Sequence, residues 1–228
     1  MKNHFSFSLV HSPFILSLVL FAGCQSVLLT ALVLVKGTDE PPKYSILLKG
    51  EKRVAVVARS MIPAYELQGA PREVARQVAQ SLDDNTRNKK LHIVEQSKVE
   101  SWLDNCNHVF ESFTEVGQDK TINADIVIGI DIAGFQIRDP QSAYLVQGKC
   151  SVNVKAIDCK TGQVLASETL NITDPPNIPL QGGVGLEAAF RPQFIGVVAQ
   201  RIAALFHHYD KKKINRFDAD NLDMTRIE

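Results

Sequence analysis

Few side chains in this sequence stand at a spacing that would support acid–base catalysis. Asp131 interrupts a run of alternating isoleucines, and a strand would place it on the face opposite to them. Acid–base work needs a second acid or a histidine within hydrogen-bond reach, and the sequence indicates no such partner for Asp131. We therefore interpret Asp131 as part of a partly solvated strand face, and we predict that the chain is not an enzyme.

A metal site is suggested by the cluster of His207, His208 and Asp210. Adjacent side chains point in different directions, so these two histidines could share a metal ion only with ligands from elsewhere. Histidines near the C-terminus of a helix also interact favourably with the helix dipole, which accounts for the cluster without a metal. The sequence contains no CxxC pair, which disfavours structural zinc. We predict neither a metal nor a cofactor.

A glycine pattern, GxGxxA, is formed by Gly183, Gly185 and Ala188. A dinucleotide-binding loop requires this pattern directly after the first strand of a βαβ unit. Here the pattern follows a proline-rich segment late in the chain. We interpret it as a loop before the last helix, and Phe190 is a candidate for contact with a partner protein.

Cys150 and Cys159 allow a geometric test of disulfide bonding. Along one extended strand, nine residues separate their α-carbons by roughly 30 Å, whereas a disulfide needs less than about 7 Å. We expect them not to pair with each other and interpret them as buried or half-buried thiols. A bond from Cys106 to either of them stays open.

Composition limits the class of protein. The 228 residues include 25 basic and 25 acidic side chains, so the formal net charge is zero. Nucleic-acid binders usually carry a basic excess, so we expect no nucleic acid among the partners. The hydrophobic fraction of 45% and the charged fraction of 22% are typical of a globular domain.

The first 43 residues predict a targeting segment. A nearly uncharged run spans residues 5–35, and LFAGC at residues 20–24 resembles a bacterial lipobox, in which small residues precede the cysteine that receives the lipid. The resemblance makes Cys24 the lipidation site of a mature lipoprotein. The apolar residues 27–35 leave an uncleaved transmembrane anchor open, and a plain cleaved signal peptide is the third alternative. All three place the domain outside the cytoplasm.

The rest of the chain alternates between strand and helix patterns. Period-two apolar residues at 124–137, 145–158 and 164–172 predict three consecutive antiparallel strands, joined in part by a glycine turn at Gly162. The remaining elements are expected as parallel strands at 52–59 and 91–95, a helix at 71–84, a short helix opened by a Ser97–Glu100 capping box, a short helix near 111–121, and a last helix opened by Pro192. The predicted fold class is α/β (α+β), with a mixed sheet of about five strands.

Three stretches resemble the CsgG superfamily of envelope lipoproteins, which includes LpoB and the N-terminal domain of TolB. They are KRVAVVAR at 52–59, ADIVIG at 124–129, and the hairpin VKAIDCKTGQVL at 154–165. The likeness covers about residues 50–210. It implies a three-layer α/β domain with an assembly, scaffolding or regulatory role and without catalysis.

The sequence therefore predicts a signal or anchor segment followed by a polar linker at 1–43, a CsgG-like domain at 44–210 and a polar, flexible tail at 211–228. The predicted function is that of a non-enzymatic, membrane-anchored envelope lipoprotein, facing the periplasm or the cell exterior, that binds proteins to assemble, secrete or regulate a surface structure. Expected partners are the membrane, envelope proteins and further copies of the chain. The alternative is a periplasmic module that binds a small molecule or a glycan.

Overall fold

The structure is a computed structural model that describes residues 39–61, 67, 69–106, 110–138, 142, 144–177, 179–181 and 185–210. All of these except Asp39 belong to one compact unit that begins at Glu40. Cys24, Gly183 and the tail after residue 210 lie outside the described residues. The lipidation site and the limits of the three predicted segments therefore stay predictions.

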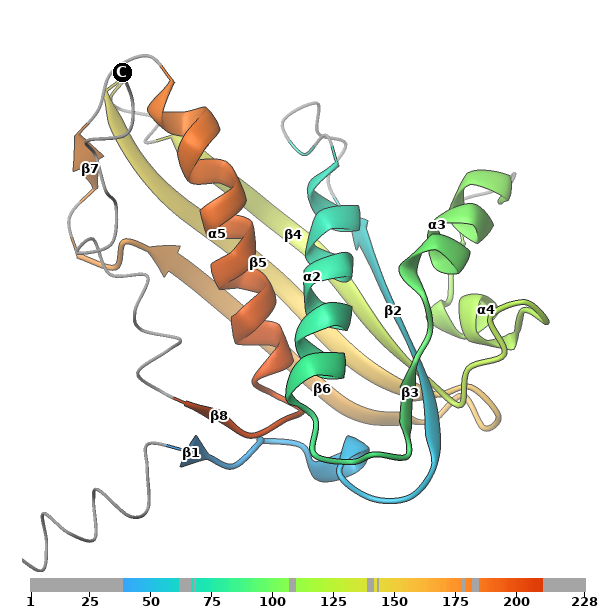
Figure 1. Cartoon of the computed structure of the whole chain (residues 1–228). Helices are drawn as coiled ribbons and strands as arrows, with labels where there is room; N and C mark the ends of the chain where they lie inside the picture. Colours follow the sequence, from blue (N-terminus) through green and yellow to red (C-terminus); the bar gives the residue numbers. More distant parts are fainter. Residues whose placement is uncertain are drawn as a thin grey trace, which may run out of the picture. The chain divides into compact units, whose positions relative to one another are not determined.

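A mixed sheet of six strands forms the centre of the unit, in the order β3-β2-β4-β5-β6, with the short β7 beside β5 (Figure 1). Strand β2 is parallel to β3 and β4, and β4, β5 and β6 form an antiparallel meander. The strands are β2 (Lys52–Ser60), β3 (Leu91–Ile93), β4 (Ile126–Arg138), β5 (Leu145–Asp158), β6 (Val164–Asp174) and β7 (Leu180–Gln181). The predicted fold class is confirmed.

Two long helices cover one face of this sheet, and two short helices lie at its β2 side (Figure 1). The long helices are α2 (Ala70–Asn85) and α5 (Leu186–Ala203), and the short ones are α3 (Gln96–Asn105) and α4 (Phe113–Gln118). A 3₁₀ turn, η1 (Ser45–Leu47), precedes β2, and the two-residue strands β1 (Asp39–Glu40) and β8 (Tyr209–Asp210) pair with each other. Within the described residues no helix has the length and apolar character needed to span a membrane.

The sheet is buried on both faces at its β2–β4 end, whereas the sequence predicted one buried face. The four isoleucines from Ile126 to Ile132 pack in one cluster with α2 and α5. Val127 belongs to a second cluster on the opposite face, with Phe113 of α4 and Val99 of α3. The structure therefore has three layers at β2 and β4, with helices on both faces of the sheet, but helices cover only one face toward β6.

A register shift between Ile132 and Gly134 changes the side-chain alternation of β4. Ala133 is exposed at this point, and Phe135 and Ile137 then take the buried face that the even-numbered isoleucines hold before it. An extra residue in one strand has this effect because side chains alternate with a period of two.

Two predicted helix starts are wrong. Helix α5 begins at Leu186, so Pro192 lies inside it, and Leu205 and Phe206 follow its end at Ala203. Helix α3 begins at Gln96 without a side-chain cap, whereas a complete capping box occurs at Ser112 and Glu115 of α4. At this interior position Pro192 cannot donate the usual hydrogen bond to the carbonyl four residues earlier. The burial of Leu186 and Phe190 in the core favours the helix before the proline and offsets that loss.

The two aspartates of the family-like stretches fix the backbone. The Asp125 carboxylate accepts a hydrogen bond of 3.0 Å from the Arg53 backbone N–H, which lowers the pKa of Asp125. The Asp158 carboxylate accepts bonds from the backbone and hydroxyl of Thr161, which lowers its pKa, and Gly162 closes the turn at φ 71°. Both motifs are thus explained by strand register and turn geometry.

Candidate functional site

Asp131 is buried and forms an ion pair, which corrects its interpretation as part of a partly solvated face. Only 5% of the residue is exposed, and its Oδ1 lies 2.6 Å from Nε of Arg59. The two residues are direct neighbours in the parallel register of β2 and β4. Arg59 also donates through Nη1 to the backbone oxygens of Phe110 and Glu111.

The guanidinium of Arg59 is packed between aromatic rings. Its central carbon lies 5.1 Å from the ring centroid of Phe110 and 4.6 Å from that of Phe113, both within cation–π range. The ion pair therefore holds the segment before α4 against the sheet. Sequence reasoning did not identify Arg59 as the partner of Asp131. The two residues become neighbours only when β2 and β4 are paired in parallel in the observed register.

His207 is buried in the core and not on an exposed metal-binding surface. It is 5% exposed, its Nε2 lies 3.4 Å from Oγ of Ser81, and its Nδ1 lies 2.6 Å from the backbone oxygen of His208. Burial lowers the pKa of His207, which favours the neutral ring. Among the described residues no group of three or more acidic, histidine or cysteine side chains could hold a metal ion. Since α5 ends at Ala203, His207 does not lie in its last turn.

The described cysteines of β5 and its turn are free thiols, as predicted for Cys150 and Cys159. They belong to different core clusters. Burial raises the pKa of Cys150 to about 12 and that of Cys159 to about 11. A thiol is a nucleophile only as the thiolate, so both are structural. Cys106 is half-buried at the C-cap of α3.

The glycine pattern does not open a nucleotide-binding loop. Gly185 is the N-cap of α5 with φ 104°, a conformation that favours glycine, and α5 is the last helix rather than one that follows the first strand. Phe190 is buried and stacks on Phe194, so it is a core residue and not a partner contact.

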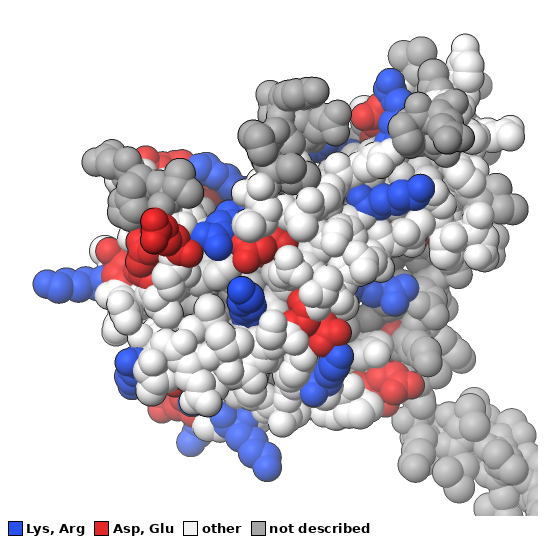
Figure 2. All heavy atoms as spheres, turned by 180° about the vertical axis from the view of Figure 1, so that it is seen from behind, with Lys and Arg blue, Asp and Glu red and all other residues white. Residues whose placement is uncertain are grey.

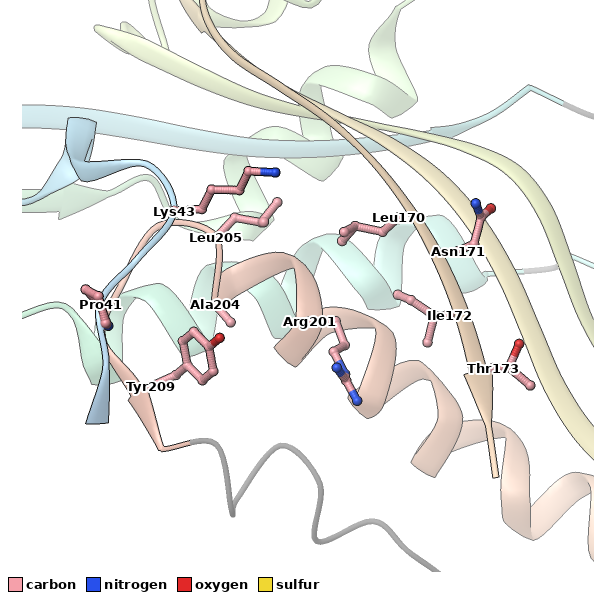
Figure 3. Close-up of a pocket in the computed structure, with 10 residues that line it drawn as sticks. All are labelled: Pro41, Lys43, Leu170, Asn171, Ile172, Thr173, Arg201, Ala204, Leu205 and Tyr209. Atoms are coloured by element: carbon pink, nitrogen blue, oxygen red, sulfur yellow. The ribbon is translucent and has the colours of Figure 1, made fainter. Parts of the chain in front are cut away.

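A groove of about 430 Å³ runs along β6, and sequence reasoning did not find it. Four consecutive residues of β6 line it, so it follows the edge of the strand rather than one of its faces. Figure 3 shows Leu170 and Ile172 on the side of β6 nearer α5, with Arg201 and Tyr209 across from the strand. The lining residues are Pro41, Lys43, Leu170, Asn171, Ile172, Thr173, Arg201, Ala204, Leu205 and Tyr209.

The segment before β2 closes one end of this groove. The Tyr44 hydroxyl donates to the backbone oxygen of Ser167 and to the carboxylate of Glu168, both at 2.9 Å. Lys43 pairs with the same carboxylate at 2.6 Å, and this hydrogen bond, with that of Tyr44, lowers the pKa of Glu168. The edge of β6 is thus covered at Ser167 and Glu168, while residues 170–173 face the groove. Sequence reasoning had assigned Lys43 to a linker.

The face of the sheet opposite α2 and α5 is polar along β5 and β6. Ser151 donates to Asn171 at 2.9 Å, and Thr169 donates to Asn153 at 2.8 Å, which forms cross-strand pairs. Figure 2 shows the molecule from this side, with acidic and basic side chains interspersed among uncharged residues. This charge pattern agrees with the zero net charge and does not suggest a polyanionic partner.

No family model matches the chain, and no curated protein matches it. Among solved structures, the PelC dodecamer from Paraburkholderia phytofirmans shares 14% identity over 74% of this chain and 96% of that chain, with a TM-score of 0.42. A lipoprotein from Neisseria meningitidis shares 14% over 64% and 96%, with a TM-score of 0.40. The C-terminal domain of LpoB from Salmonella enterica shares 10% over 56% and 87%, with a TM-score of 0.36. At scores below 0.5 these likenesses assign neither a function nor an oligomeric state to this chain, and the resemblance to CsgG and TolB stays a prediction.

Proposed function

We propose that the chain is a non-enzymatic, membrane-anchored envelope protein that binds an extended segment of a partner protein along β6. The observation that carries the proposal is the groove of about 430 Å³ beside residues 170–173. Strand β6 is the last strand of the main path of the sheet, and within the described residues it pairs with β5 alone. Backbone groups on the outer side of such a strand are a template for one more strand.

The dimensions of the groove suit a short extended peptide. Four strand residues extend about 13 Å, and the bond from Tyr44 to Ser167 sets the limit of the open edge at one end. Leu170 and Leu205 supply apolar wall, and the basic side chains of Lys43 and Arg201 also line the groove, where Lys43 pairs with Glu168. A segment that is neutral or acidic suits this wall better than a basic one.

A groove-filling substitution tests the proposal. Ala204→Trp places a large ring in the groove from the end of α5, whereas Ala133→Trp adds the same ring at an exposed position of β4 that does not line it. After cross-linking in cells, the anchored Ala204→Trp protein is expected to lose its main co-purified protein, while Ala133→Trp keeps it. Retention by both variants, with thermal midpoints matching the wild type, would refute the groove as the binding surface.

The membrane anchor is tested separately. Cys24 is the cysteine of the lipobox-like segment, so wild-type cells fed radiolabelled palmitate are expected to label the protein and Cys24→Ala cells are expected not to. A protein that stays unlabelled in the wild type would argue for one of the two other targeting alternatives. Cys106→Ala serves as the control and is expected to keep the label.

The alternative, a glycan-binding module, is favoured by one observation. The polar face of β5 and β6 presents amide and hydroxyl groups at Asn153, Ser151 and Thr169. A thermal-shift screen with soluble cell-wall fragments separates the two functions. An increase in the midpoint that Asn153→Leu abolishes and Ala204→Trp preserves would favour the glycan module.

A further inference from the structure

A second cavity, of about 460 Å³, lies at the C-terminal end of β2 and is separate from the β6 groove. Arg59 and Ser60 line it from the end of β2, Arg72 from the first turn of α2, and Leu103 and Phe110 from α3 and the segment before α4. It therefore joins two cationic side chains to an apolar wall.

The position of this cavity follows from the topology of the sheet. Strand β2 lies between β3 and β4 and is parallel to both. The chain leaves β2 through α2 to reach β3 on one side, and returns through α3 and α4 to β4 on the other. In open α/β sheets the crevice at such a switch point, outside the carboxyl ends of the strands, is where small ligands bind.

Arg59 is held in a fixed position and keeps N–H donors that could bind a ligand. Its Nε binds Asp131 at 2.6 Å, and its Nη1 binds the backbone oxygen of Phe110 at 2.8 Å. For Nη2 there is no hydrogen-bond partner within the described part of the chain, although the side chain keeps only 24% of its surface exposed. A guanidinium held by a carboxylate and by Phe110 presents its remaining N–H groups with little loss of side-chain entropy.

Arg72 supplies the second cation from the rim. It pairs with Asp104 of α3 through Nη1 and Nη2. Because both partners are about half exposed, this pair is weak enough to be exchanged for another anion. Asp104 thus competes with any anion that enters the cavity.

We propose that this cavity binds a small organic anion, in which a carboxylate or phosphate contacts Arg59 and Arg72 and an apolar group contacts Leu103 and Phe110. Such a division between a few polar groups and an apolar wall is usual for small-molecule sites of this size. The charged group accepts hydrogen bonds from Nη2 of Arg59 and from the guanidinium of Arg72. The proposal does not depend on the β6 groove or on the anchor.

Calorimetric titration of the purified full chain tests the proposal with four probes: phenyl phosphate, benzoate, inorganic phosphate and phenol. One or both of the aromatic anions are expected to bind at millimolar concentration or below, more tightly than inorganic phosphate, and phenol is expected not to bind. The choice between phenyl phosphate and benzoate identifies the charged group that the site prefers.

Three substitutions on exposed side chains provide the controls. Arg72→Gln is expected to weaken binding about tenfold, as the loss of a charged hydrogen-bond pair would. Asp104→Asn is expected to strengthen binding several-fold, because it removes the competing carboxylate. Arg76→Gln, one turn further along α2 and also paired across to α3 through Glu100, is expected to change the affinity less than about twofold. The proposal is overturned if neither aromatic anion binds, if phenol binds equally well, or if Arg72→Gln and Arg76→Gln have the same effect.

Discussion

At the residue scale, the ion pair of Arg59 and Asp131 links the sheet to the segment before α4. Asp131 is 5% exposed, and its partner also binds two backbone oxygens and two aromatic rings. A buried pair of this kind stabilises little compared with apolar residues of the same size, but the loss of one partner leaves an uncompensated charge.

Asp131→Asn is therefore expected to lower the free energy of unfolding by about 3 kcal/mol, measured by urea denaturation. The double variant Arg59→Met/Asp131→Leu removes both charges and is expected to lose less than the single variant. A double variant that is the less stable of the two would contradict this account of the pair.

The burial of His207 predicts that the free energy of unfolding depends on pH. Burial lowers its pKa below 6.5 in the folded chain, so the unfolded chain takes up the proton more readily. The contribution of neutral His207 is complete above pH 7 and is lost as the pH falls through 6.5 toward the folded pKa. The free energy of unfolding is expected to decrease between pH 7.5 and about pH 5.5.

His207→Gln should flatten this decrease, whereas His92→Gln, at an exposed position of β3, should leave it intact. Equal slopes for wild type and His207→Gln would show that another group controls stability in this range.

At the scale of elements, two glycines let aromatic rings lie directly on strand backbone. A β-carbon on Gly148 of β5 would collide with the ring of Phe194 in α5, and one on Gly129 of β4 would collide with the ring of Phe113 in α4. These two contacts set how closely helices approach the two faces of the sheet.

Gly148→Ala is expected to destabilise the fold by about 2 kcal/mol through overpacking, and Phe194→Leu in the same chain should recover part of the loss. Gly134→Ala is the control, because the nearest atom to its added β-carbon is Ser151 Cβ at 3.9 Å. Thermal unfolding of the wild type and these three variants measures the effect, and equal losses for Gly148→Ala and Gly134→Ala would contradict the packing.

The elements that sequence patterns predicted well are those with local signals. The sequence predicted the strands around Ile128 and Val154 and the helix after Pro71. Each of these elements has a regular spacing of apolar residues within one short stretch of sequence. The start of α5 and the capping box of α4 were missed because long-range packing decides among several acceptable local signals. The bulge at Ala133 was missed because an extra residue in β4 can be recognised only from the register of its pairing with β5.

At the scale of the whole molecule, a predicted anchor at Cys24 precedes a domain in which β6 ends the main path of the sheet, with no further strand beside it among the described residues. The groove beside β6 was not foreseen, since it is formed by Lys43, residues 170–173 and Arg201, which are far apart in the sequence. The sequence could suggest Asp131 and His207 as polar residues of interest, but not that both are buried in the core.

Photocrosslinking in intact cells tests whether a partner binds along β6, with a photoreactive residue placed in turn at Leu170, Asn171, Thr173 and Lys160. The first three positions line the groove, whereas Lys160 lies exposed in the turn between β5 and β6. We expect the groove positions to capture one envelope protein through one and the same segment, located by mass spectrometry, and Lys160 to capture none of it. Capture from Lys160 alone, or unrelated proteins at each groove position, would contradict binding along β6.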